Sequence, residues 1–457
     1  MKQFAFLSFL ALLFCAAHAQ AQTAFESARL YAQSPSNVRN GIVRTFDDTS
    51  FVSCNLDVDS ARYIFTLVSP SLPAKQLQLP KDYVVADFQL FQDQVFCCGT
   101  NKSGSYSVGF VGTFAIASFY SQGAPPFTIY NLDSSICVVD KMLVYDAGGQ
   151  NKCHIAALGS SMCPVTQSWF SDCLLECDYD FPTSLFTNLL GKTPHCSAPQ
   201  QVLCQYLYNI IETDTNVILL SAPDPNIGQG IYLRRCNKAN VTNAQSDIVF
   251  HYYTTTEPAF QGISGIAIDQ FLFATASPQL DAQHWSMNVR IYKIASMDNI
   301  AVHQIPLEEK TKPAEMRYSK RLNQLYLVQH HNYTTQHNTD CDVVCFDLSQ
   351  SSPYLAPILY HPFPSRYSTF TSIDLMNETA LIVGSHFDAA WWYKDFAIPQ
   401  GSASCYKVFN VPVKLPNPLV KSSFGDPMDT VLIPVRQSTE TLTKITCLVS
   451  VECTFNK

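Results

Sequence analysis

A short strand–turn–strand pattern recurs along this chain, and it constrains the fold more than any other feature. One copy has an apolar run over Ala86–Phe91, a short polar turn, a second run over Val95–Gly99 and, after a polar tip, a third over Tyr106–Gly112. A unit of this size cannot bury its apolar face alone, so neighbouring units are expected to pack against one another. Eight such units begin near Phe51, Ala86, Ile136, Tyr206, Gly262, Pro313, Phe370 and Met428.

These repeats predict an all-β fold, a β-propeller with seven blades of four antiparallel strands. Several units start about 50 residues apart, which is the length of a four-stranded blade. Charged residues make up only 14% of the chain and aromatic residues 12%, which suits half-buried strands better than solvated helices. Eight partial units give seven blades if the strands near Val431–Val451 close the ring with N-terminal strands, which removes free sheet edges. The chain has only 17 Gly, so Asn, Asp, Ser and Pro are expected to form many of the turns.

The N-terminus has the pattern of a secretory signal peptide, which we place at residues 1–21. Lys2 precedes an apolar run that ends near Ala17, and small residues at the cleavage site follow it. Residues 22–457 are then expected to form a single propeller domain. No later stretch reaches the roughly 18 apolar residues of a membrane span. The mature chain is therefore expected to be exported, to a periplasmic, cell-surface or extracellular location, without a transmembrane segment.

Cysteine usage agrees with export. The chain has 17 cysteines, and removal of Cys15 with the signal peptide leaves an even number, which favours disulfides in an exported protein. Cys15 could instead carry a lipid anchor, but Phe14 stands where a small residue is needed. Cys97 and Cys98 are adjacent in an expected strand, so they should point to opposite faces and not pair with each other. The alternative for several cysteines is a buried free thiol that packs as a small hydrophobic side chain.

Residues 160–204 do not fit the repeat spacing. The runs Ser168–Cys177 and Thr183–Gly191 have the pattern of short helical turns, and the second is followed by a helix-stopping glycine. We therefore predict a small Cys-rich insertion, stapled by local disulfides, that is either part of a binding face or a stabilising flap. Its cysteines are Cys163, Cys173, Cys177, Cys196 and Cys204.

One stretch resembles a known group of proteins. The sequence Val84–Gly99, followed by Gly109–Gly112, resembles secreted β-propeller-like proteins of Bacteroides-type bacteria, most of them uncharacterised. The resemblance is clearest over residues 84–119. It implies a propeller fold and secretion, and it brings no catalytic motif that could be transferred to this chain.

Motifs that would indicate catalysis are missing from the sequence. It has no Gly-x-Ser-x-Gly elbow, no phosphate-binding Gly-rich loop and no His-Glu-x-x-His zinc helix. Asp87, Asp269 and Asp374 occupy similar places in their repeats, which favours a shared role in turns over the unequal acid and base of a glycosidase. The net charge of −8 disfavours a nucleic-acid partner. We predict no catalytic residue and no cofactor.

His330, His331 and His337, with Asp340 nearby, are the candidate metal ligands, because imidazole and carboxylate groups bind zinc and similar ions. They match no established ligand spacing, and the alternative is a polar hairpin tip. The isolated histidines are expected to be surface or hydrogen-bonded side chains. These are His251, His284 and His303.

Aromatic side chains give the better indication of function. Trp391, Trp392 and Tyr393 fall in an expected long connection after a strand, and Trp285 falls in a comparable loop. Such rings stack on sugars or anchor protein partners, although one of the paired tryptophans could instead fill the core between blades. The sequence favours an exported, non-catalytic, monomeric protein that presents loops of one propeller face to a glycan or protein partner, or serves in a surface assembly. The alternative is a polysaccharide-acting hydrolase or lyase with carboxylates at the central channel.

Overall fold

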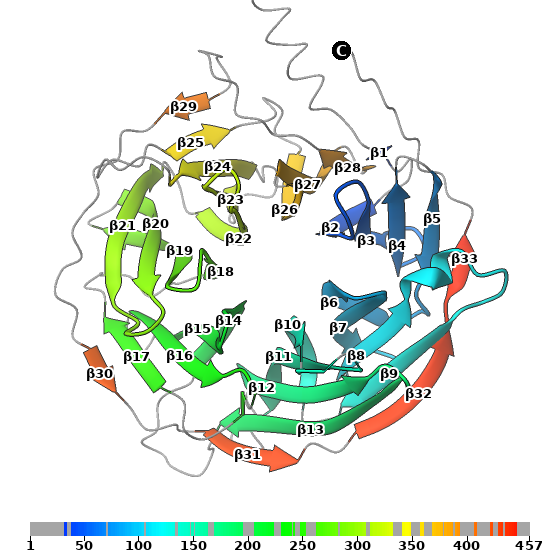
Figure 1. Ribbon diagram of the computed structural model, residues 1–457. Coiled ribbons are helices and arrows are strands. Elements are labelled where there is room, and N and C mark those ends of the chain that lie inside the picture. The colour runs from blue at the N-terminus through cyan, green and yellow to red at the C-terminus, as the bar shows by residue number, and fades with distance from the viewer. Residues whose placement is uncertain are drawn as a thin grey trace, which may run out of the picture.

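The described strands of the chain form sheets that are arranged radially around a common centre (Figure 1). Apart from one 3₁₀ turn, Ile116–Phe119, the regular structure of this part of the chain is β-strand. It holds no helix that could span a membrane. The computed structural model describes residues 32–33, 38–69, 72–104, 107–132, 136–146, 148–149, 151–162, 169–194, 205–223, 230–239, 241–242, 247–252, 262–281, 284–307, 311–331, 341–348, 357–360, 368–377, 379–386, 389–393, 406–408, 421–423, 428–432 and 435–445.

Seven sheets follow one another around the ring, and within each sheet consecutive strands pair antiparallel from the centre outward. The first is β2 Val38–Thr45, β3 Phe51–Asp57, β4 Arg62–Ser69 and β5 Leu72–Gln78. The second is β6 Tyr83–Phe91, β7 Gln94–Asn101, β8 Val108–Ala115 and β9 Pro126–Leu132. The third is β10 Ile136–Asp146, β11 Lys152–Met162, β12 Trp169–Asp180 and β13 Leu185–Pro194. The fourth is β14 Gln205–Glu212, β15 Asn216–Pro223, β16 Gly230–Asn237 and β17 Asp247–Tyr252.

The other three sheets complete the ring. The fifth is β18 Ser264–Ala267, β19 Leu272–Asp281, β20 His284–Lys293 and β21 Asn299–Leu307. The sixth is β22 Thr311–Ser319, β23 Gln324–His331, β24 Cys341–Asp347 and β25 Pro357–Tyr360. The seventh is β26 Ser368–Met376, β27 Thr379–His386 and β28 Ala389–Tyr393, with β1 Ala32–Gln33 added at its outer edge.

The predicted all-β propeller is confirmed. Six of the eight predicted unit starts fall at or within three residues of a first strand, because each of these strands carries the apolar residues that pack between sheets. Two starts were wrong. Phe51 begins the second strand of its sheet, and Met428 begins a strand that is not part of a hairpin unit. Turns without glycine are also confirmed: Asn323 and Asn377 take left-handed backbone conformations, with φ of 51° and 47°, at the tips after β22 and β26.

The ring closes differently from the prediction. N-terminal strand β1 pairs with β28, so that Ala32 lies opposite Trp392 and Gln33 opposite Trp391. The first and last sheets also meet along the inner strands, where Val43 N–H donates to Ser372 Oγ at 3.3 Å. The strands near Val431 do not close the ring, because they lie on its outside.

The C-terminal part of the chain runs backward around the outside of the propeller (Figure 1). Its five strands, here called the belt, pair antiparallel with the outer strands β25, β17, β13, β9 and β5 in that order. Each belt strand covers a sheet edge that would otherwise present unpaired peptide groups. The belt strands are β29 Tyr406–Val408, β30 Lys421–Ser423, β31 Met428–Leu432, β32 Val435–Thr441 and β33 Thr443–Ile445.

The helical turns predicted within residues 160–204 are wrong. Residues 169–194 form β12 and β13, the third and fourth strands of the third sheet. Leu174 and Leu175 are both buried, one on each face of β12, as expected for a strand covered on both sides. The described part of the expected insertion therefore belongs to the ring, and residues 163–168 and 195–204 lie outside the described residues, as does the expected signal peptide.

The core lies between neighbouring sheets. Cys97 packs in the cluster between the first and second sheets, and Cys98 packs in the cluster between the second and third sheets, which confirms that they point to opposite faces. Burial raises the pKa of both thiols well above the ordinary value, so they stay protonated. Free thiols, the alternative left open above, occur among the described residues at Cys54, Cys97, Cys98, Cys137, Cys153 and Cys177. Disulfides elsewhere in the chain stay a prediction.

His303 on β21 is neither a surface nor a hydrogen-bonded histidine, contrary to expectation. Its side chain is buried beside Phe346, and neither ring nitrogen has a hydrogen-bond partner among the described residues. Burial lowers the pKa of His303 from 6.5 to about 4. Between about pH 6.5 and pH 4 the folded chain therefore holds a neutral imidazole, whereas the unfolded chain takes up a proton.

The buried imidazole predicts that the difference in stability between His303→Leu and wild type depends on pH. Above about pH 6.5 both states carry a neutral histidine, and as the pH falls toward 4 the unfolded wild-type chain is stabilised by protonation. The variant should therefore gain stability relative to wild type as the pH falls, by up to about 3 kcal/mol. Urea unfolding between pH 7 and pH 4 measures this, and a difference that is the same at every pH would contradict it.

Candidate functional site

The inner strands share a local irregularity. Six of the seven first strands contain a register shift relative to the second strand, at the same position in the repeat. A bulge of this kind bends the strand and re-aims the side chain that follows it. The residues that follow the shifts are Ile42, Asp87, Lys141, Asn209, Glu315 and Ser372.

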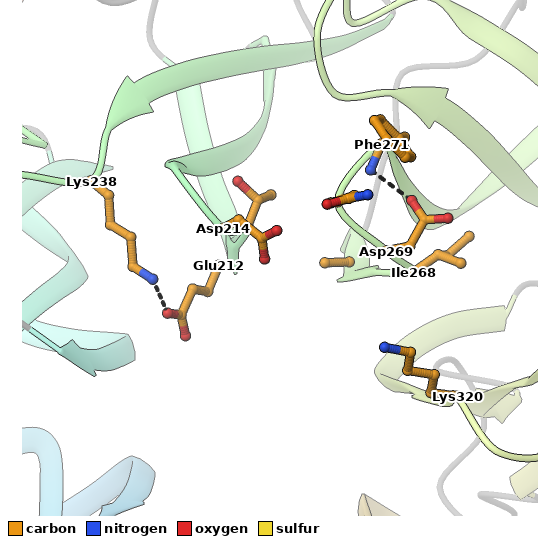
Figure 2. Close-up of a pocket in the computed structure, with 10 residues that line it drawn as sticks. Glu212, Asp214, Lys238, Ile268, Asp269, Phe271 and Lys320 are labelled. Atoms are coloured by element: carbon orange, nitrogen blue, oxygen red, sulfur yellow. Dashed lines mark hydrogen bonds and ion pairs between the residues drawn. The ribbon is translucent and has the colours of Figure 1, made fainter.

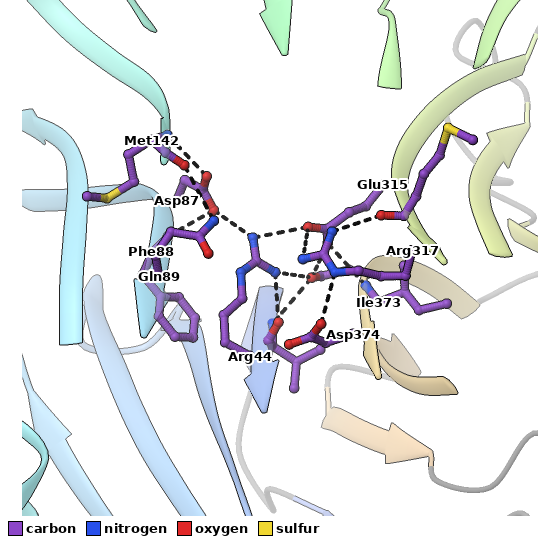
Figure 3. A network of polar contacts seen from close by, with 12 residues as sticks. Arg44, Asp87, Phe88, Gln89, Met142, Glu315, Arg317, Ile373 and Asp374 are labelled. Carbon is purple, nitrogen blue, oxygen red and sulfur yellow. Dashed lines mark hydrogen bonds and ion pairs between the residues drawn. The ribbon is translucent and has the colours of Figure 1, made fainter. Parts of the chain in front are cut away.

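Charged side chains from these strands meet at the centre of the ring, in what we call the central network (Figure 3). Arg44 of β2 bridges two sheets, because its Nη2 lies 2.8 Å from Asp87 Oδ1 and 3.0 Å from Glu315 Oε1. Its Nη1 donates to the carbonyl oxygen of Val43 at 2.7 Å and to Ser372 Oγ at 3.3 Å. The guanidinium is 5.7 Å from the centre of the Phe88 ring.

A second arginine extends the central network to the seventh sheet. Arg317 Nη2 lies 2.7 Å from Glu315 Oε1, and Arg317 Nε donates to Asp374 Oδ1 at 2.9 Å. Asp374 Oδ2 accepts from the backbone N–H of Thr45 at 2.7 Å. Glu315 Oε2 accepts from Ser372 Oγ and from the N–H of Ile373. The central network thus joins the second, first, sixth and seventh sheets, including the two that meet at ring closure.

The electrostatics of the central network hold Glu315 ionised. Burial alone would raise the pKa of Glu315, but the charges of Arg317 and Arg44 outweigh burial and lower it to about 2. Burial would likewise lower the pKa of Arg317, and Glu315 and Asp374 raise it instead. These groups therefore have no proton to give or take near neutral pH.

The shared turn role predicted for three aspartates holds for one of them. Asp269 caps a turn, since its Oδ1 accepts from the N–H groups of Phe271 and Leu272 at 2.6 and 2.7 Å. Asp87 and Asp374 lie on inner strands and bind arginines instead. Sequence position alone did not separate these environments, because the turn and the inner strand are adjacent in every repeat.

A cavity of about 290 Å³, here the central cavity, adjoins the central network. Small residues at or beside the register shifts form part of its wall, together with Arg44, Glu315 and Lys141. These small residues are Gly41, Ala86, Ala314 and Thr371.

A second opening lies where the turns of the fourth, fifth and sixth sheets meet (Figure 2). This face groove has a volume of about 630 Å³. All inner strands run in the same direction, so their turns to the second strands share one face of the ring. The charged residues of the face groove are Glu212, Asp214, Lys238, Asp269 and Lys320.

Phe271 stands at the rim of the face groove and is 65% exposed, the highest exposure among the large hydrophobic residues described. Its turn is rigid, because Asp269 accepts two backbone hydrogen bonds and the N–H of Ile268 donates to the carbonyl of Leu272 at 2.9 Å. Lys238 pairs with Glu212 and lies 5.1 Å from the centre of the Tyr145 ring, whereas Asp214 and Lys320 have no ion-pair partner within the described residues.

The aromatic residues predicted to bind a ligand lie on strands of two different sheets. Trp391, Trp392 and Tyr393 lie on β28 and not in a long connection, which corrects the prediction. Trp285 lies on β20 opposite Leu280. Trp285 is therefore on a strand and not in the expected loop, and the sixth sheet lies between β20 and β28 around the ring. β28 is only five residues long, so its sequence is too short to show a clear alternation.

The histidine-rich segment joins β23 to β24, as expected for a hairpin tip. His330 and His331 are the last two residues of β23, where they pair with Lys312 and Thr311 of β22, and His337 lies outside the described residues. No group of three potential metal ligands occurs within the ranges given above. The metal site stays a prediction.

Sequence reasoning missed Arg44, Lys141, Glu315, Arg317 and Phe271. The inner-strand residues could have been found from a short motif that recurs close to them. In this motif an apolar residue is followed by a small or polar residue and then by a polar residue, as in Val85-Ala86-Asp87 and Pro313-Ala314-Glu315. No protein-family model matches this chain, and no curated protein is significantly similar to it.

Proposed function

We propose that this chain is an exported, non-catalytic binding protein that presents the turns of one propeller face to a glycan, with each of the seven sheets serving as one blade. The observation that carries the proposal is the exposed Phe271 ring, held on a rigid turn at the rim of the face groove. A preorganised aromatic ring binds without first losing conformational freedom.

The groups around Phe271 suit a sugar. An aromatic face packs against the apolar C–H face of a sugar ring, and neighbouring polar groups bond to its hydroxyls. Asp214 and Asp269 supply acceptors, and Lys320 supplies a donor. Asp214 and Lys320 come from different sheets, so a ligand of oligosaccharide size could contact three turns at once.

The enzyme alternative has less support. Glycoside cleavage needs two carboxyl groups about 5 to 10 Å apart, one of them protonated at the working pH. The carboxylates of the central network are instead engaged by arginines, and the pKa of Glu315 is lowered to about 2. The enzyme hypothesis expects carboxylates at the central channel. Charged side chains do meet at the ring centre, but their ion pairs connect different sheets.

A glycan array with the mature protein tests the proposal, followed by calorimetry with the best ligand. Phe271→Ala should weaken binding about tenfold, because a buried aromatic contact contributes on the order of 1 to 2 kcal/mol. Phe46→Ala is the matched control: Phe46 is a 38% exposed ring near the turn of the first sheet, outside the face groove.

Equal losses in the two variants, or no glycan bound by a folded wild-type protein, would refute the proposal. The roles of Trp285, Trp391, Trp392 and Tyr393 in ligand binding also stay proposals. Substitutions in β28 need a thermal unfolding measurement beside the binding assay, because β28 pairs with the ring-closing strand β1.

A further inference from the structure

The central cavity is built by four successive irregularities in the ring. Gly41, Ala86, Ala314 and Thr371 each lie within the register shift of their inner strand. All four line the cavity. The extra residue of a bulge is left out of the strand ladder, and a small side chain at this position leaves room beside the backbone.

The cavity wall carries one cation, Lys141, that makes no ion pair within the described residues. Arg44 and Glu315 are engaged with each other and with Asp87 and Arg317. Lys141, which follows the bulge of β10, also lines the cavity and is only partly buried. It acts on Glu315 through space but makes no ion pair within the described residues. Its neighbour Asp140 interacts with Ser160 Oγ at 3.4 Å and is not part of the wall.

The wall also has a surplus of hydrogen-bond donors. The Tyr63 hydroxyl has no protein partner within the described residues, and burial raises the pKa of Tyr63 to about 12, so the hydroxyl keeps its proton. The Nε–H of buried Arg44 has no acceptor either. The partly buried Lys141 ammonium and the unpaired donors favour a ligand that brings negative charge and acceptor oxygens.

We propose that the central cavity binds a small oxyanion, a carboxylate or phosphate group, through the ammonium of Lys141 and the hydroxyl of Tyr63. The volume of about 290 Å³ is at the lower end of ligand sites and suits a small molecule rather than a polymer. This site is separate from the face groove and does not depend on the function proposed for it.

Titration calorimetry on the mature protein at low ionic strength tests the proposal, with phosphate, succinate and glucuronate as probes and glucose as the neutral control. At least one anion should bind and glucose should not. Lys141→Met should weaken anion binding about tenfold or more, because a charge-assisted hydrogen bond is lost. Tyr63→Phe should weaken it less, since it removes one neutral donor. Lys320→Met, at the exposed face groove, is the matched control and should bind as wild type.

Binding of none of the three anions would overturn the proposal, as would wild-type affinity in Lys141→Met or an equal loss in Lys320→Met. Thermal unfolding of each variant separates loss of the site from loss of the fold. If Lys141→Met does not fold, Lys141→Arg and Tyr63→Phe decide the question: the first keeps the charge and should retain binding, and the second should reduce it. Phe271→Ala should leave anion binding unchanged, so failure here and failure of the proposed function are distinguishable.

Discussion

Arg44→Met is expected to destabilise the fold by about 3 to 5 kcal/mol, because it leaves buried carboxylates without their counter-charge. Arg44 is 4% exposed and contacts Asp87 and Glu315 in two other sheets, so no water molecule from bulk solvent can easily replace it. Removal of one partner of a buried ion pair costs more than the pair itself contributes. Urea unfolding at pH 7 measures the loss.

Arg62→Met is the matched control for this prediction. Arg62 is also a β-strand arginine of the first sheet, but its Nη1 donates to the neutral amide oxygen of Gln78 at 3.2 Å. Its replacement should cost less than about 1 kcal/mol. A loss of the same size in both variants would show that Arg44 of the central network contributes no more to stability than Arg62 does.

The same network predicts the acid sensitivity of the protein. The folded pKa of Glu315, about 2, lies below the ordinary value of 4.5. Its contribution to stability is therefore present above about pH 4.5 and is lost as the pH falls toward 2, and it amounts to about 3 kcal/mol. Glu315→Gln should be less stable than wild type at pH 7, and this difference should shrink between pH 4.5 and pH 2.

Removal of the belt is expected to have the second large effect. Truncation before Tyr406 takes away β29 to β33 and exposes the outer edges of five sheets. Each backbone hydrogen bond lost costs about 1 kcal/mol net, and open edges pair with other chains. The truncated protein should unfold at a temperature lower by about 10 °C or more and should associate into oligomers or aggregates. Thermal unfolding and light scattering measure the two effects.

A graded truncation provides the control. Truncation after Thr441 removes β33 alone and leaves four belt strands in place. It should cause a much smaller loss of thermal stability than the complete truncation. If both truncations behave alike, the belt does not act strand by strand on the sheet edges.

The sequence predicted those parts of the fold that are determined by residues close together along the chain. The run Val84–Gly99 alternates and turns as β6 and β7 do, and adjacent cysteines at 97 and 98 had to face opposite sides of a strand. The low glycine count indicated that other residues form turns, and Asn323 and Asn377 do so with a left-handed backbone. Local geometry decides all of these features.

The features missed from the sequence depend on partners far along the chain. β1 has two residues and pairs with β28, and β29 and β30 have three residues each, so no periodicity can show them. Thr45 and Asp374 are hydrogen-bonded across a separation of 329 residues. Ser168–Cys177 was assigned to a helical turn because both faces of β12 are buried, and a two-sided apolar run shows no alternation.

The reversed course of the belt has a consequence for biosynthesis. Residues 406–445 leave the ribosome after every sheet that they cover, so the nascent chain carries five unprotected sheet edges until these residues have been synthesised. Chaperones that shield strands have their greatest importance in that interval. A stop codon before Tyr406 should therefore be harmful even though all seven sheets have already been synthesised.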